Sequence, residues 1–138
     1  MANSKLYHDL KDTQRYFINR QTNADTSDGW KLSIQGKTIQ DAMYLYDNLK
    51  YLLSALNLPF KVGTQKLIDK NTEQSTKLMT IYIQNGYSVY TIAEMFYNKI
   101  ANYKGWYDIK TPTSYEHYAG AIFIRNDRNN KGNYIPAK

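Results

Sequence analysis

The segment 30–35 places the strongest constraint on the fold. It alternates apolar Trp30, Leu32 and Ile34 with polar Lys31, Ser33 and Gln35. A period of two is typical of a β-strand with one apolar and one polar face. The pattern therefore predicts a sheet that is covered by other elements on one face only. The three polar side chains are expected together on the opposite face.

Two stretches have the apolar spacing of helices that pack on such a sheet. The first runs over 39–57 and stops before Pro59. Thr38, just before it, and Asp41, in its first turn, resemble a capping box. The second begins at Val89 and has apolar residues to position 103. Weaker patterns predict an N-terminal helix over 4–18 and a brief helix near 64–70.

Short β-branched and aromatic runs predict further strands near 60–62, 78–83 and 121–125. Residues 19–29, 69–77 and 104–118 have the composition of loops. The expected fold class is α+β: a small mixed sheet of about four strands, with two main helices on one face plus an N-terminal helix.

The length of 138 residues suits one hydrophobic core. We expect an N-terminal helix and loop over 1–28, an α+β core domain over 29–125, and a loose basic tail over 126–138.

The sequence does not contain the residues that several kinds of chemistry require. There is no cysteine, the two histidines are far apart, and no phosphate-cradling glycine loop or paired-carboxylate motif occurs. We therefore expect no metal and no cofactor. The sequence also contains no run of roughly 18 apolar residues and no apolar signal core, so the expected location is cytoplasmic, either in the protein's own cell or in a host.

The net charge of +6 is spread along the chain. A basic surface favours an anionic partner, although it also serves solubility alone. The 14 tyrosines, with much Asn, Lys and Ile, suit AT-rich coding DNA and a viral-type source. The tyrosines fit a protein-recognition surface, stacking on single-stranded nucleic acid, or plain packing of the core.

Four basic residues are attached to the predicted strands: Lys31, Lys61, Lys77 and Arg125. If they converge, they form an anion site of phosphate size. Lys61 has apolar neighbours on both sides, so it is either an edge residue facing water or a base aimed into a pocket.

The runs Gly29-Trp30-Lys31-Leu32-Ser33-Ile34, Leu58-Pro59-Phe60-Lys61-Val62 and Lys77-Leu78-Met79-Thr80-Ile81-Tyr82-Ile83 resemble the phosphothreonine lyases. These are bacterial effector lyases and the N-terminal lyase domains of class III and IV lanthipeptide synthetases. The resemblance covers roughly residues 29–125 and is one of order and spacing.

The resemblance implies removal of phosphate from phosphothreonine or phosphoserine by β-elimination. Lys61 would match the general base, Lys31 the lysine of the first strand, and Arg125 a phosphate-binding arginine, with Lys77 as a further phosphate ligand. Ser33 stands where the family has its acid histidine, and the loop before Lys77 lacks the expected arginine. A hydroxyl is a poor proton donor at neutral pH.

Three functions stay open. The first is a non-catalytic lyase-like domain that binds an anionic ligand, namely a phosphopeptide, a nucleotide or nucleic acid. The second is an active lyase with a rearranged acid, for which His117 is a candidate that the spacing does not require. The third is an accessory protein that binds nucleic acid or blocks a host protein.

Overall fold

The computed structural model describes residues 4–128 and Asn133. In chain order its elements are α1 (Ser4–Asp12), β1 (Phe17–Arg20), β2 (Trp30–Gln35), α2 (Ile39–Ala55), β3 (Phe60–Gly63), α3 (Gln65–Lys70), the 3-10 turn η1 (Glu73–Thr76), β4 (Lys77–Tyr82), α4 (Val89–Lys99), β5 (Glu116–Ala119) and β6 (Ile122–Asn126).

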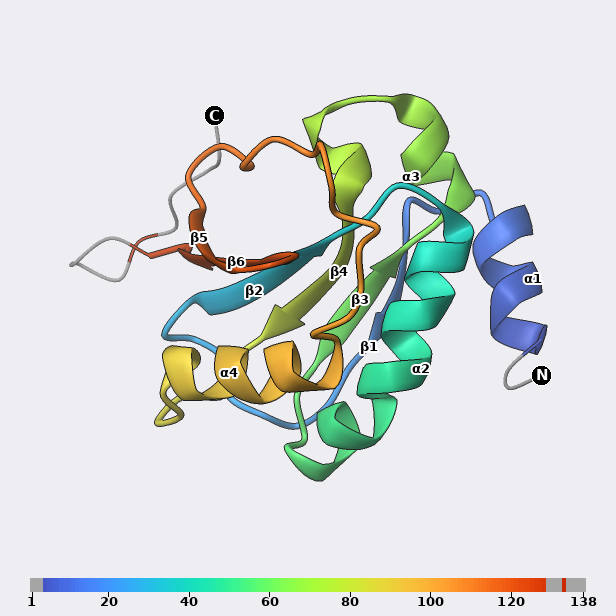
Figure 1. The fold of residues 1–138 in the computed structure, drawn as a ribbon. Coiled ribbons are helices and arrows are strands. Elements are labelled where there is room, and N and C mark those ends of the chain that lie inside the picture. Colours follow the sequence, from blue (N-terminus) through green and yellow to red (C-terminus); the bar gives the residue numbers. More distant parts are fainter. Residues whose placement is uncertain (1–3, 129–132, 134–138) are drawn as a thin grey trace.

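The strands form one sheet in the order β1-β3-β4-β2-β6-β5 (Figure 1). All the strand pairs described are antiparallel. The α+β class is confirmed, but the expected mixed sheet of about four strands is wrong, because this sheet has six strands and is antiparallel. Adjacent strands thus alternate in direction, and long connections bring β2 to the centre.

The two strands missed by the sequence patterns are the edge strands β1 and β5. Phe17 and Ile18 looked like the end of a helix, but the helix ends at Asp12 and they pair with Gly63 and Val62 of β3. β5 carries exposed Glu116 and His117, so it lacks a buried face that alternation could reveal.

Helices α2 and α4 cover one face of the sheet (Figure 1). The predicted capping box is present, since Thr38 accepts from the backbone of Asp41 and Asp41 accepts from the backbone of Thr38. The buried stripes of the two helices pack on the apolar side chains of β2, β4 and β6 in a single core: Ala42, Leu45, Leu49, Leu53, Ile92, Ala93 and Phe96 against Leu32, Ile34, Met79, Ile81, Ile122 and Ile124.

A register shift interrupts the pairing of β2 with β4. Ile34 lies opposite Met79, but Gln35 lies opposite Lys77, so one residue of β4 is skipped. Such a β-bulge changes which face the following side chain occupies. Lys77 therefore shares a face with Gln35 and Thr80, whereas strict alternation from Thr80 would have put Leu78 there.

The chain after α4 leaves the helix layer, arches past η1 and returns to the sheet edge as β5 (Figure 1). We call residues 104–115 the arch. No described helix is long and apolar enough to cross a membrane. Of the tail expected over 126–138, residues 129–132 and 134–138 lie outside the described part of the chain.

Candidate anion-binding site

The second face of the sheet, the polar face, brings the predicted site residues together. Ser33 lies opposite Thr80 on β4 and Phe123 on β6, and Thr80 in turn lies opposite Lys61 on β3. Lys31 lies opposite Arg125, two residues along the same strands and therefore on the same face. Lys31, Lys61, Lys77 and Arg125, which we call the cation cluster, thus project from four strands onto one face.

The carboxylate of Asp127 joins two members of the cluster. Its Oδ1 lies 3.2 Å from Lys31 Nζ and 3.4 Å from Arg125 Nε. The Lys31 and Asp127 side chains are each 15% exposed, and that of Arg125 is 4% exposed. The charges therefore interact in a partly dry environment, where Coulomb interactions are stronger than in water.

Lys77 is the buried centre of the cluster. Burial is the largest cause that lowers the pKa of Lys77, and the charges of Lys31, Arg125 and Lys61 lower it further. The neighbouring Glu73 carboxylate opposes these effects. Because all three other cluster members act on Lys77, the four cations form one electrostatic unit.

Lys61 does not extend into open solvent. Its Nζ lies 4.1 Å from the ring centre of Phe17 on the adjacent edge strand β1, a cation–π contact. Burial lowers the pKa of Lys61, and the charge of Lys31 lowers it further, while Asp127 raises it. The Lys61 ammonium thus lies over a ring of the edge strand, and it interacts electrostatically with Lys31 and Asp127.

Ser33 and Gln35 form a buried polar pair beneath the cluster. Both side chains have no exposed surface, and Gln35 Nε2 donates to Ser33 Oγ at 3.1 Å. Because Ser33 accepts this bond, its hydroxyl hydrogen stays available as a donor. Gln35 Oε1 has no hydrogen-bond partner among the described residues. The position expected to carry an acid therefore carries a neutral hydroxyl.

His117 lies on β5, opposite Phe123. Its ring stacks on Phe123 with centroids 4.7 Å apart, and its Nε2 lies 2.8 Å from the carbonyl oxygen of Gly120. Phe123 stands between His117 and Ser33 in the cross-strand row. The imidazole is therefore directed toward the β5–β6 turn and not toward the cation cluster.

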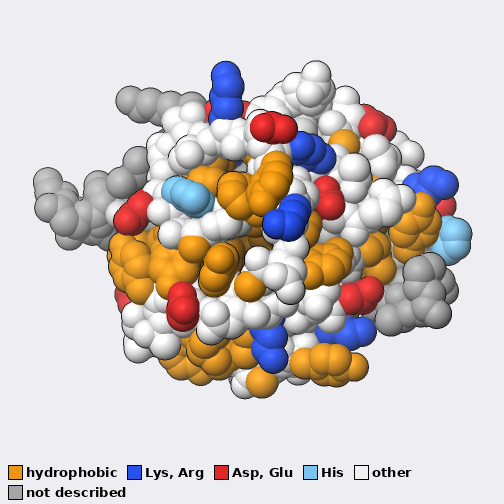
Figure 2. All heavy atoms as spheres, in the orientation of Figure 1, with side chains coloured by type: hydrophobic (Ala, Val, Ile, Leu, Met, Phe, Trp, Pro, Cys, Tyr) orange, Lys and Arg blue, Asp and Glu red, His pale blue; other side chains and the backbone are white. Residues whose placement is uncertain are grey.

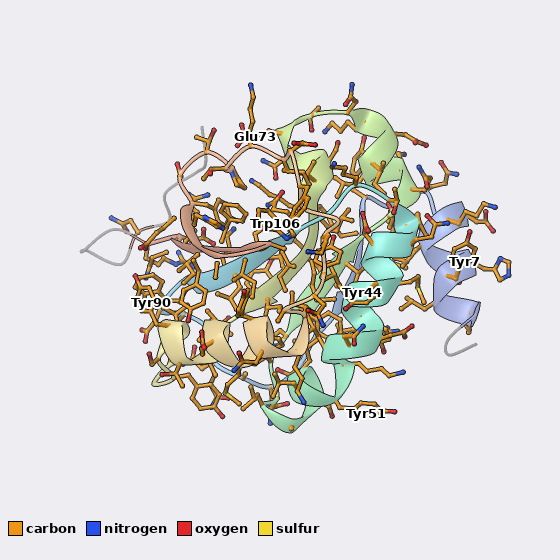
Figure 3. All side chains as sticks on the ribbon, in the orientation of Figure 1. Tyr7, Tyr44, Tyr51, Glu73, Tyr90 and Trp106 are labelled. Carbon is orange, nitrogen blue, oxygen red and sulfur yellow. The ribbon has the colours of Figure 1, made fainter. Side chains whose placement is uncertain are left out.

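The arch supplies a wall of the site. The ring of Tyr115 lies near two cluster ammonium groups, with its centre 4.8 Å from Lys77 Nζ and 5.9 Å from Lys31 Nζ. Glu73 of η1 holds this segment by accepting hydrogen bonds from the Thr113 backbone and, at 2.9 Å, from its hydroxyl. Figure 3 shows Glu73 near the top of the view and Trp106, at the start of the arch, below it.

Sequence reasoning missed Asp127, Gln35, Tyr115 and Glu73 as site residues. The sequence did contain a signal for Asp127, because it stands two residues after Arg125 and so falls on the same face of an extended chain. It also contained one for Gln35, which continues the alternation of Lys31 and Ser33. Tyr115 and Glu73 gave no such signal, since each reaches the polar face from a segment with no repeating pattern.

The wider surface is mixed. Figure 2 shows Lys and Arg side chains interspersed with acidic ones on the face drawn, without a continuous basic stripe. Tyrosines serve more than one purpose: Tyr103 is buried, whereas Tyr51 is 78% exposed. Within residues 4–128 and at Asn133, no three His, Asp or Glu side chains are grouped so that they could hold a metal ion.

Comparison with solved structures shows a similarity to the type III effector and phosphothreonine lyase OspF from Shigella flexneri. The alignment covers 83% of this chain and 66% of that chain, with a TM-score of 0.53 and 15% sequence identity. This chain thus spans somewhat less than two-thirds of OspF. No family model and no curated protein matches. At this identity the similarity is one of fold alone, and it supports the resemblance from the motifs at that level.

Proposed function

We propose that this protein binds a phosphate-bearing ligand at the cation cluster, without cleaving it. The observation that carries the proposal is the meeting of four cationic side chains from four strands on one face, where the charges of the other three cations lower the pKa of Lys77. Holding several like charges together is unfavourable unless an anion compensates them.

The cluster has the chemistry that a phosphate group requires. Arg125 offers a planar fork of donors, and the lysines offer point charges. The carboxylates of Asp127 and Glu73 interact with this cluster of four cations. The remaining positive charge suits a doubly charged oxyanion.

Binding is favoured over catalysis by the surroundings of Ser33. β-Elimination needs an acid to protonate the leaving phosphate, and loss of such a group costs about 10²- to 10⁴-fold in rate. Ser33 is buried and neutral, and His117 is turned toward Gly120.

Calorimetry with inorganic phosphate and with a phosphothreonine peptide tests the proposal. Lys61→Met should weaken binding by roughly ten- to a hundredfold, as expected for a charged hydrogen bond. Lys66→Met is the matched control, since it removes an exposed lysine that also lies over an aromatic ring, that of Tyr16. Equal affinities for the two variants, or no binding by the wild type, would contradict the proposal.

An active phosphothreonine or phosphoserine lyase is the second candidate, favoured by the lowered pKa of Lys61, which suits a general base. Mass spectrometry of a phosphothreonine peptide after incubation should then show loss of phosphoric acid, and Lys61→Met should abolish it. An unchanged peptide after many hours excludes this candidate.

The remaining expectations are predictions from the sequence. They are a nucleic-acid or protein partner, a role in blocking a host factor, and a cytoplasmic location in the protein's own cell or a host. Binding to nucleic acid should weaken steeply with salt. Co-purification with one host protein that persists at high salt would favour a protein partner instead.

A further inference from the structure

A row of aromatic side chains continues the polar face beyond the cation cluster. Phe123 stacks on His117, the ring centre of His117 lies 6.3 Å from that of Trp106, and Trp106 meets Tyr107 edge to face at 4.9 Å. We call these four residues the aromatic shelf. Two segments build it: the β5–β6 hairpin and the start of the arch.

The outer members of the shelf are open to solvent. Phe123 is 4% exposed, but His117 is exposed, Trp106 is half-buried and Tyr107 is 46% exposed. A row that served only to cover the sheet edge would bury its largest rings, as Phe123 is buried. Exposed π surfaces near clustered cations are typical of sites that stack planar ligands.

The shelf and the cation cluster adjoin along two strands. Phe123 and Arg125 share a face of β6 two residues apart, which corresponds to roughly 7 Å along a strand. On the other segment, the Tyr115 ring lies near Lys31 and Lys77, and His117 follows two residues later. Along both segments, the distance between the cations and the stacking rings is about the length of the sugar that joins a phosphate to a base.

Resting on the proposed function, we propose that the phosphate-bearing ligand is a nucleotide, with its phosphate at the cation cluster and its base stacked on the aromatic shelf. A phosphopeptide needs the cations but has no use for a row of exposed rings. A nucleotide uses both, because every base has a π face.

Affinities of the full chain for inorganic phosphate, ribose 5-phosphate, a set of nucleoside monophosphates and a phosphothreonine peptide test this proposal. At least one nucleotide should bind about tenfold or more tightly than ribose 5-phosphate, since stacking on a base contributes that much. Nucleotides that bind no better than ribose 5-phosphate, or less tightly than the peptide, would overturn the inference and leave the proposed function standing. Absence of binding by all four would remove both.

Variants separate the two halves of the site. Trp106→Ala and His117→Ala should reduce nucleotide affinity about tenfold and leave that for inorganic phosphate unchanged, whereas Lys61→Met should weaken both. Trp106→Phe and His117→Phe keep a ring and should restore most of the loss. Tyr51→Ala is the control, since Tyr51 is exposed and lies at the far end of α2 (Figure 3).

A direct spectroscopic measurement completes the test. The chain has two tryptophans, so in a Trp30→Phe background the tryptophan fluorescence, excited at a wavelength that tyrosine does not absorb, comes from Trp106 alone. Stacking of a base should quench this emission in a saturable manner, and ribose 5-phosphate should not. Saturable nucleotide binding with no change in Trp106 emission, together with unchanged affinity in Trp106→Ala and His117→Ala, would contradict the shelf as the base site.

Discussion

Lys31 Nζ lies 3.2 Å from Asp127 Oδ1 on the polar face of the sheet. The same oxygen lies 3.4 Å from Arg125 Nε, so one carboxylate serves two cations. Asp127 therefore lowers the net charge of the cation cluster while it helps to hold two of its members in place.

Asp127→Asn should separate these two effects. We expect affinity for inorganic phosphate to rise, because a negative charge beside the anion site is removed. The free energy of unfolding should fall by about 2 to 4 kcal/mol, because two largely buried cations lose their carboxylate. Calorimetry and urea unfolding measure the two quantities, with Asp12→Asn on the exposed end of α1 as the control. Weaker phosphate binding in a folded variant would contradict the assignment.

The lowered pKa of Lys61 predicts a pH dependence. Between that pKa and the 10.5 of an unperturbed lysine, the unfolded chain holds a proton that folded Lys61 has lost. The free energy of unfolding should therefore rise with pH across this window, whereas affinity for an anion should fall. Urea unfolding at pH values up to about 10 measures the rise. Lys61→Met should show a smaller rise, and identical slopes would argue against a buried amine at this position.

We expect Glu73 to hold the arch in place. Hydrogen bonds from Thr113, first from its backbone and then from its hydroxyl, lower the pKa of Glu73. Its stabilising effect is therefore present above the usual pKa of a glutamate and is lost as the pH falls through the lowered value. Glu73→Gln should speed hydrogen exchange at the Thr113 amide at neutral pH, with little change in the melting temperature. Exchange as slow as in the wild type would show that the arch is held by other contacts.

Ser33→Ala tests the buried pair with Gln35. The substitution leaves Gln35 Nε2 without its acceptor in a site that water does not reach, so the free energy of unfolding should fall by about 1 to 3 kcal/mol. Gln35→Leu in the Ser33→Ala background should recover part of this loss, because both polar partners are then gone. A chemical unfolding series of the four proteins measures the coupling. An additive double variant would mean that the pair does not act as a unit.

Gly36 should tolerate no side chain, because a Cβ there would lie 2.5 Å from Tyr103 Oη and 2.7 Å from Leu78 Cδ1. Gly36→Ala should cost about 1 to 3 kcal/mol of unfolding free energy. Tyr103 Oη also donates to the Gln35 carbonyl at 2.8 Å, so displacing it loses a buried hydrogen bond. In a Tyr103→Phe background, the cost of Gly36→Ala should shrink, since one of the two clashing atoms is absent. An equal cost in both backgrounds would contradict this contact.

Periodicity predicted the elements that have one buried face. β2 and α2 were found because their apolar residues recur at the spacing of their own backbone, and Thr38 fixed the start of α2. β1 and β5 were missed because four-residue edge strands are recognisable only by their partners. The strand order could not be predicted either, because local patterns do not reveal which strands pair. The pairing of β2 with β6, for example, joins positions about ninety residues apart in the chain.

The site was predictable in part. Lys31 and Ser33 follow from alternation within one strand. Lys61, Lys77 and Arg125 were selected because they are basic residues attached to the other predicted strands, and the motif resemblance only implied their roles. That these side chains meet depends on the register of β3, β4 and β6, which no local pattern encodes. The covering aromatic ring of Tyr115 depends on the path of the arch, which is held by the side chain of Glu73, forty positions earlier in the chain.

The skipped residue between β2 and β4 decides in which layer Lys77 lies. Lys77 and Thr80 are three positions apart, so a regular strand of the same length would turn Leu78 toward the ligand side and the ammonium of Lys77 toward the leucines beneath α2. The bulge keeps both side chains in their own layers. Changes near Met79 that straighten β4 without changing its length should therefore be selected against, because they would bury a lysine charge in the apolar core and expose a leucine in its place.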